Sequence, residues 1–172
     1  MPVFPLKSKV DSYKTVGPCK FGANRPNGRK HAGVDLGITA GAPVYAIAKG
    51  TVIEASNGEF YKDTKKNINT GVITVKHDVS ITIDGTEYPS FVVRYGEVNQ
   101  VKVAVGGTVD EGALLASVAP QADEGTELHM ELYLGEQGIS ASSKFRADKK
   151  PYMRAFNPSD STSLLDSLNV KP

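Results

Sequence analysis

Two histidines and one aspartate in this sequence have side chains that commonly bind zinc. His31 and Asp35 lie four residues apart, with Gly33 between them. A fully extended chain would hold the two side chains about 13 Å apart, whereas protein ligands lie only ~2 Å from a zinc ion. The pair can therefore bind one metal only if the chain bends, which Gly33 allows and a helical turn would also achieve. The alternative is a polar loop that contains both residues by chance.

The histidine at position 129 lies in a segment of strictly alternating apolar and polar residues. Such alternation predicts a strand with one face in the core. We expect the core face to comprise Leu128, Met130 and Leu132. We expect the polar face to comprise Glu127, His129, Glu131 and Tyr133. Two carboxylates around one imidazole suit a metal site or a general base, although a solvated face of an antiparallel sheet has the same pattern.

A third polar group occurs in residues 93–97 (VRYGE). In a regular strand, Tyr95 and Glu97 would point to one side and Arg94 to the other. A tyrosine and a glutamate on one face could flank a water molecule at a metal. The alternative is an ordinary exposed carboxylate.

The elements that must position these residues are short strands rich in Val and Ile, separated by Gly and Pro. No long window shows the 3.6-residue period of a helix. Asp84-Gly85 predicts a hairpin turn, residues 55–69 and 135–150 predict polar loops, and Ser159 or Ser161 can cap one short helix near the C-terminus. A mainly β, antiparallel architecture is therefore expected. The predicted strands are residues 44–52, 71–77, 80–83, 91–98, 101–105, 114–118 and 128–134.

Length and composition narrow the class of protein. The 172 residues favour a single domain over 1–172, and a formal net charge of +1 argues against a nucleic-acid partner. The one cysteine, Cys19, cannot form an internal disulfide, and it excludes a zinc site made only of cysteines. No apolar run is long enough for a signal peptide or a membrane span, so we expect synthesis in the cytoplasm.

Taken in order, these segments resemble the lysostaphin-type (LytM-like) zinc peptidases. The resemblance covers about residues 20–135, which would form the core, followed by a polar loop and tail over 136–172. It implies a compact β fold of antiparallel sheets, the duplicated hybrid motif, with a groove over the metal site. The matching segments are residues 31–35 (HAGVD), 41–46, 50–52, 71–77, 95–97, 101–112 and 128–132, with a similar exit around 151–158.

The resemblance also implies a function. One Zn²⁺ per chain would be held by His31, Asp35 and His129, in a zinc metalloendopeptidase that hydrolyses peptide bonds in the stem peptides or cross-bridges of bacterial peptidoglycan. Three protein ligands and one water form an open catalytic zinc site, and zinc lowers the pKa of that water towards ~7. Glu131 is a candidate for orienting an imidazole ligand from behind.

The sequence departs from the family pattern at two positions. Glu127 and Glu97 stand where members of the family usually have catalytic histidines, although one branch of the family also reads Arg-Tyr-Gly-Glu. A glutamate is a competent general base, and we expect Glu97 to serve first and Glu127 second, with Tyr95 as a hydrogen-bond donor to the oxyanion. Arg94 would then face away from the metal.

Three other residues have two interpretations each. We expect His77, at the end of a strand, to be structural. Arg25 and Arg29 flank the first motif, either as plain surface charges or as contacts for substrate carboxylates.

Two other functions remain open. A metal-retaining but inactive module could bind peptidoglycan or regulate another hydrolase, because both usual histidines are missing. A biotinyl or lipoyl carrier domain needs a lysine at a hairpin tip, whereas Lys149 and Lys150 lie in a polar tail. If the protein acts on the cell wall, we expect delivery by a phage, an injection machine or lysis.

Overall fold

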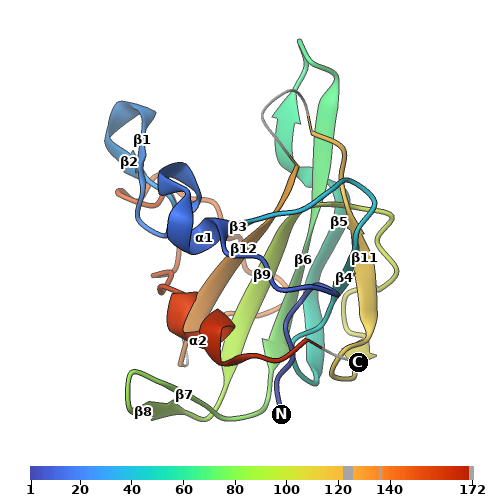
Figure 1. Ribbon diagram of the computed structural model, residues 1–172, viewed down its shortest axis with the longest axis vertical. Helices are drawn as coiled ribbons and strands as arrows, with labels where there is room; N and C mark the ends of the chain where they lie inside the picture. Colours follow the sequence, from blue (N-terminus) through green and yellow to red (C-terminus); the bar gives the residue numbers. More distant parts are fainter. Residues whose placement is uncertain (122–125, 136, 171–172) are drawn as a thin grey trace.

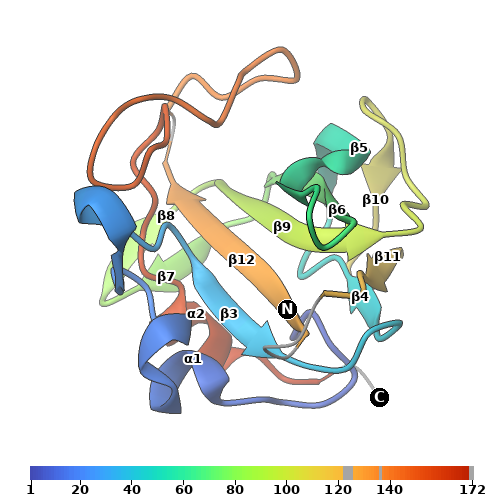
Figure 2. The ribbon, with the colours of Figure 1, turned by 90° about the horizontal axis from the view of Figure 1, so that it is seen from above.

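One large antiparallel sheet dominates the computed structural model, which describes residues 1–121, 126–135 and 137–170. Its central path runs β10-β5-β6-β9-β11-β4, and β12 pairs with both β9 and β3. Figure 2 shows β12 crossing the molecule between β9 and β3. The strands are β3 (Val34–Gly37), β4 (Pro43–Tyr45), β5 (Gly50–Asp63), β6 (Ile68–His77), β9 (Phe91–Asn99), β10 (Thr108–Val109), β11 (Leu114–Val118) and β12 (Glu127–Leu134).

Small elements border this sheet. Tyr13 in α1 donates a hydrogen bond of 2.6 Å to Asp166 in α2, so the two helices hold the ends of the chain together. Both helices lie on the β3–β12 side of the molecule (Figure 1). No described helix is long and apolar enough to cross a membrane. The small elements are α1 (Ser12–Thr15), the 3₁₀ turns η1 (Gly17–Cys19) and η2 (Pro26–Gly28), the hairpins β1 (Asn24–Arg25)–β2 (Arg29–Lys30) and β7 (Ile81–Ile83)–β8 (Thr86–Tyr88), and α2 (Thr162–Ser167).

Alternation along β12 separates the core from the polar face. Leu128, Met130 and Leu132 are fully buried in the main hydrophobic cluster, as the sequence pattern predicts. The mainly β, antiparallel prediction is confirmed, as are the Asp84-Gly85 hairpin and a short helix near the C-terminus. The expected serine cap is wrong: the helix begins directly after Ser161, but the Ser161 side chain caps no amide, and the Thr162 amide donates to Asp160 at 2.9 Å.

Three predicted elements differ from the structure. Residues 55–69, expected to form a loop, belong mostly to β5 and β6, which continue as a two-stranded ribbon to a turn at residues 64–67 (Figure 1). Most of the side chains in this ribbon are exposed or only partly buried, with Phe60 and Thr70 as the buried exceptions, so its sequence does not alternate. Residues 101–105 form no strand, and the strand expected over 44–52 is split into β4 and β5.

The C-terminal region agrees with the expected polar loop. The described residues between 135 and 150 form no regular element beyond a single bridge between Arg146 and Arg154. Glu136 and the last two positions of the expected tail lie outside the described residues.

His77 is structural, as expected. Its side chain is fully buried at the end of β6, where its ring lies 4.8 Å from the ring of Phe91. The Nδ1–H group donates to the Lys49 carbonyl at 3.2 Å, and Nε2 has no hydrogen-bond partner among the described residues. Burial lowers the pKa of His77 to about 4, against the carbonyls and Asp78, which raise it.

This pKa predicts a pH-dependent stability. In the folded protein the pKa of His77 lies below its unfolded value of about 6.5, so burial of the neutral imidazole contributes fully to the free energy of unfolding above that pH. The contribution is lost as the pH falls towards 4, a change of about 3 kcal/mol. We expect the free energy of unfolding in urea to fall more between pH 7.5 and pH 4.5 for the native protein than for His77→Gln. Equal falls in the two proteins would contradict this assignment.

Candidate metal centre

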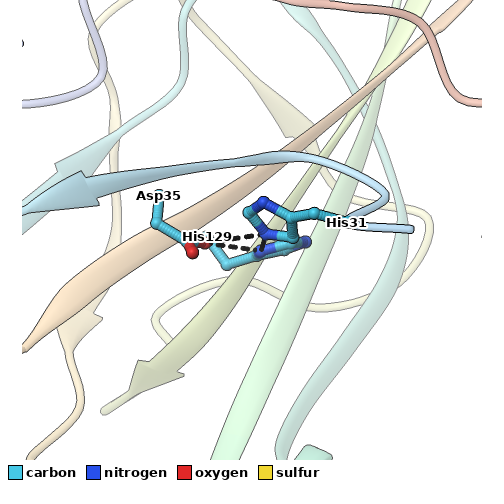
Figure 3. Close-up of side chains that lie close together, drawn as sticks. All are labelled: His31, Asp35 and His129. Carbon is cyan, nitrogen blue, oxygen red and sulfur yellow. Dashed lines mark hydrogen bonds and ion pairs between the residues drawn. The ribbon is translucent and has the colours of Figure 1, made fainter. Parts of the chain in front are cut away.

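His31, Asp35 and His129 converge on one point (Figure 3). Asp35 on β3 and His129 on β12 are direct partners in the antiparallel ladder, so their side chains leave the sheet on the same face. His31 precedes β3, and the chain turns back through Gly33. A Cβ at Gly33 would lie 2.3 Å from the Met130 carbonyl and 2.9 Å from His129 Nε2. Glycine is therefore required at position 33, because the chain there lies directly against the backbone of β12.

The spacing of the three ligand atoms suits a single ion. Asp35 Oδ1 lies 3.1 Å from His31 Nε2 and 2.9 Å from His129 Nδ1, and the two nitrogens are 3.1 Å apart. Donor atoms bound ~2.0–2.1 Å from a tetrahedral zinc lie about 3.3 Å from one another. Two imidazoles and a carboxylate are also a typical catalytic donor set. The residues present therefore fit a zinc ion, with one coordination position left for water or substrate.

Hydrogen bonds behind the two imidazoles select the nitrogen that faces the ion. His31 Nδ1 donates to the Lys20 carbonyl at 2.9 Å, which leaves Nε2 as the ligand atom. His129 uses the opposite nitrogen, because its Nε2 lies 3.0 Å from Glu131 Oε1 and its Nδ1 faces Asp35. Glu131 thus orients the imidazole from behind, in the position expected from the sequence.

Glu131 is a charge in the interior, and two guanidinium groups stabilise it. It is fully buried, and it accepts hydrogen bonds from Arg94 Nη1 at 3.4 Å, from Arg154 Nε at 3.0 Å and from the Tyr133 hydroxyl. Burial opposes ionisation most strongly, yet the charges of Arg94 and Arg154 hold the pKa of Glu131 well below its usual range. Glu131 therefore remains ionised and accepts a hydrogen bond from the Nε2–H group of His129.

The structure corrects the expected orientation of Arg94. Arg94 is the ladder partner of Glu131, so it lies on the same face as the metal residues and directly behind them. Its guanidinium lies 5.2 Å from the ring of Phe60 and 5.0 Å from that of Phe145, and it bonds Glu54 at 3.0 Å. These contacts explain how an arginine that is only 2% exposed retains its charge.

The expected role of Tyr95 is wrong. Its side chain is fully buried in the hydrophobic core on the other face of β9. The hydroxyl oxygen accepts a hydrogen bond from the Ile47 amide at 3.1 Å. Tyr95 therefore cannot reach an oxyanion at the metal.

Glu97 reaches the groove because β9 bulges. Gly71 and Val72 of β6 are adjacent, but they pair with Val98 and Gly96, so Glu97 is the extra residue. Its φ of 63° is in the left-handed region, as in a bulge that reverses the alternation. Regular alternation would have placed Glu97 in the core beside Tyr95, and the bulge turns it towards His129 instead.

A groove of about 960 Å³ opens over the metal residues. Arg154, Arg146 and Phe60 also line it, although no role was expected for any of these three side chains. Phe60 and Arg146 belong to the segments expected to be polar loops, and Arg154 to the exit around 151–158 that resembles the family. Of the expected residues, Tyr95 is absent from the lining. The lining residues are Arg25, Arg29, Lys30, His31, Ala32, Asp35, Gly58, Glu59, Phe60, Tyr61, Lys62, Glu97, Glu127, His129, Arg146, Tyr152, Met153 and Arg154.

Comparison with known proteins decides the family. Residues 29–141 match the model of peptidase family M23, which is more than half of the chain. The chain belongs to peptidase family M23. Among curated protein sequences, none matches this one.

Solved structures of M23 peptidases share its fold. The catalytic domain of the antimicrobial peptidase lysostaphin from Staphylococcus simulans is 20% identical, with a TM-score of 0.50 over 97% of this chain and 90% of that one. LytU is 20% identical, with a TM-score of 0.55 over 94% and 92%. A zinc-containing peptidase from Vibrio cholerae is 20% identical, with a TM-score of 0.52 over 83% of this chain and 40% of the other.

Two glutamates lie in the groove with the metal residues. Glu97 and Glu127 both line the groove, and Glu97 Oε2 is buried without a hydrogen-bond partner in the described chain. Burial is the main cause that raises the pKa of Glu97 to about 8, with further contributions from Glu127 and Asp35, while His129 opposes the shift. Burial and Asp35 likewise raise the pKa of Glu127 to about 7. Both carboxyl groups are therefore poised to exchange a proton near neutral pH.

Removing one imidazole tests the metal centre directly. We expect the native protein to bind one zinc ion and His129→Ala to lose affinity by more than the ~10–100-fold caused by the loss of an outer-shell partner. The measurement is zinc content after dialysis, with affinity from competition against a chelator. His77→Gln is the matched control, and equal zinc loss in both variants would contradict the assignment.

Glu131 has a different test, because it acts through His129. We expect Glu131→Gln to weaken zinc binding about 10–100-fold. The neutral amide oxygen is a weaker acceptor for the imidazole N–H group than the charged carboxylate. Glu54→Gln is the control, because Glu54 bonds Arg94 but does not contact His129. Competition titrations that give the same zinc affinity for the two variants would show that Glu131 stabilises only the fold.

Proposed function

We propose that this protein is a zinc-dependent endopeptidase that cleaves peptide bonds in the stem peptides or cross-bridges of bacterial peptidoglycan. The observation that carries the proposal is the close approach of three ligand atoms, 2.9–3.1 Å apart, beneath a groove lined by two glutamates. Family membership supports peptide hydrolysis, and the similar fold of lysostaphin, an antimicrobial peptidase, supports a cell-wall substrate.

His31, Asp35 and His129 would hold the zinc ion. When bound, the ion lowers the pKa of the attacking water and polarises the scissile carbonyl. Glu131 keeps His129 in the tautomer that presents Nδ1. The groove of about 960 Å³ that these residues line is large enough to take a short peptide.

Glu97 is the proposed general base. Its carboxyl group lines the same groove as His129 and Asp35, whose charges act on it, and there it would take a proton from the attacking water and return it to the leaving amine. Glu127 is the second choice, because it is less deeply buried and lies at the start of β12. Positioned proton transfer of this kind contributes ~10²–10⁴-fold to the rate.

Digestion of purified peptidoglycan tests this function. We expect the zinc-loaded protein to release new amino termini and Glu97→Gln to slow that release by about 10²-fold or more. Glu127→Gln should have a smaller effect. Glu59→Gln is the matched control, because Glu59 also lines the groove but is exposed at its rim.

The outcomes distinguish the alternatives. Full activity of both Glu97→Gln and Glu127→Gln would refute the assignment of the base. A protein that binds zinc and sediments with peptidoglycan, but releases no amino termini, would instead be the inactive binding or regulatory module. The replacement of both usual histidines by glutamate is the observation that favours this second function.

A further inference from the structure

All five arginines of the sequence gather at this one site. Arg94 lies directly behind the metal residues. The lysines are distributed differently, because only Lys30 and Lys62 of the fourteen in the described part of the chain line the groove. Guanidinium groups are thus concentrated where a substrate would bind, in a protein whose formal net charge is only +1. The four arginines that line the groove are Arg25, Arg29, Arg146 and Arg154.

Three of the five arginines already have acidic partners. Arg94 and Arg154 bind Glu131, and Arg25 Nη2 lies 3.5 Å from Asp35 Oδ2. The other two, Arg29 and Arg146, make no ion pair with any residue in the described part of the chain. Arg146 donates a hydrogen bond only to the Phe60 carbonyl, and its guanidinium lies 5.8 Å from the Phe60 ring.

Arg29 and Arg146 line the same groove, and the charge of Arg29 acts on Arg146. Partial burial is the main cause that lowers the pKa of Arg146; the charges of Arg154, Arg94 and Arg29 lower it further, and the charge of Glu131 opposes the shift. Arg29 approaches from β2, and Arg146 from the segment after β12. Two cations held near one another without an acidic partner create a positive potential that an anion would relieve.

We propose that Arg29 and Arg146 form a carboxylate-binding subsite that selects peptides with an acidic group near the scissile bond. The proposal rests on the proposed function, because it takes the groove to be the substrate site. A guanidinium presents a planar fork that matches a carboxylate with two parallel hydrogen bonds. The carboxylate is the anionic group that peptides themselves carry, either on a side chain or at the C-terminus.

The subsite extends beyond the segment that matches the family model. Arg29 is the first matched residue, and Arg146 follows the last one, at position 141. A substrate carboxylate between them would connect the β1–β2 hairpin with the C-terminal segment. Substrate preference in this chain would then depend on its own tail as well as on the shared core.

Binding of short peptides tests the subsite without any cleavage. The probes are acetyl-Gly-Glu-Gly-amide and its neutral counterpart acetyl-Gly-Gln-Gly-amide, titrated into the zinc-loaded protein and followed by NMR. We expect the acidic peptide to bind about fivefold tighter or more, as for a charge-assisted contact that stays partly hydrated. Acetyl-Gly-Gly-Gly with a free carboxylate, against its amide, shows whether a C-terminal carboxylate serves equally.

Paired substitutions separate a subsite from a general effect of charge. The Arg29→Ala/Arg146→Ala protein should lose the preference for the acidic peptide, whereas Lys65→Ala/Lys66→Ala, which removes the same charge outside the groove, should retain it. Arg29→Lys/Arg146→Lys should be intermediate, because it keeps the charges but loses the fork. Thermal unfolding of each variant checks that these exposed substitutions leave the fold intact.

The result remains interpretable if the proposed function fails. Equal binding of the Glu and Gln peptides, or equal weakening by the lysine pair, overturns the subsite even if peptidoglycan is cleaved. Selective binding with no cleavage supports the subsite and refutes the peptidase. If cleavage occurs, peptidoglycan with its carboxylates converted to amides should be cut at least about fivefold more slowly than unmodified peptidoglycan. The Arg29→Ala/Arg146→Ala protein should cut the two substrates at equal rates.

Discussion

The site depends on the register of β12 between its two neighbours. Pairing with β3 sets His129 opposite Asp35, and pairing with β9 sets Glu131 opposite Arg94. Both pairings must be correct at once. The β3 pairing places the ligand Asp35 beside His129, and the β9 pairing places Arg94 beside Glu131, the carboxylate that orients His129. A shift of one residue would turn Leu128 and Met130 to the groove and His129 into the core. Burial of Leu128, Met130 and Leu132 therefore favours the same register that the metal site requires.

Behind the metal residues, the polar face of β12 is buried and forms a second, smaller interior. Glu131 and Tyr133 are fully buried on the face opposite the main core, under Phe145 and Phe156. A lone carboxylate there would cost several kcal/mol. Arg94 and Arg154 offset that cost, and the aromatic rings around Arg94 exclude water from the ion pairs. The consequence is a fixed imidazole, because none of the groups that position His129 can readily move.

Alternation and motif order predicted the parts of the site that obey regular geometry. The polar face and the core face of β12 follow from alternation. The convergence of His31 with Asp35 was implied by the family resemblance, because their spacing around Gly33 is equally compatible with a polar loop. The orientation of Glu97 could not be predicted in this way, because a bulge is set by the partner strand β6 rather than by residues 93–97 themselves. Arg154 was missed for a related reason: it lies in an irregular tail, and only the three-dimensional path of that tail brings it to Glu131.

Charge balance connects the two glutamates with the arginines. Neutral imidazoles at positions 97 and 127 would add no negative charge beside Asp35, whereas Glu97 and Glu127 add two once the pH exceeds their raised pKa values. One divalent cation would neutralise two of three carboxylates, and Arg25 beside Asp35 balances the third. Behind the floor, Glu131 and Glu54 balance Arg94 and Arg154. Among the guanidinium groups of the described site, Arg29 and Arg146 are the two without an ion pair, so positive charge is left on the groove lining at these two residues.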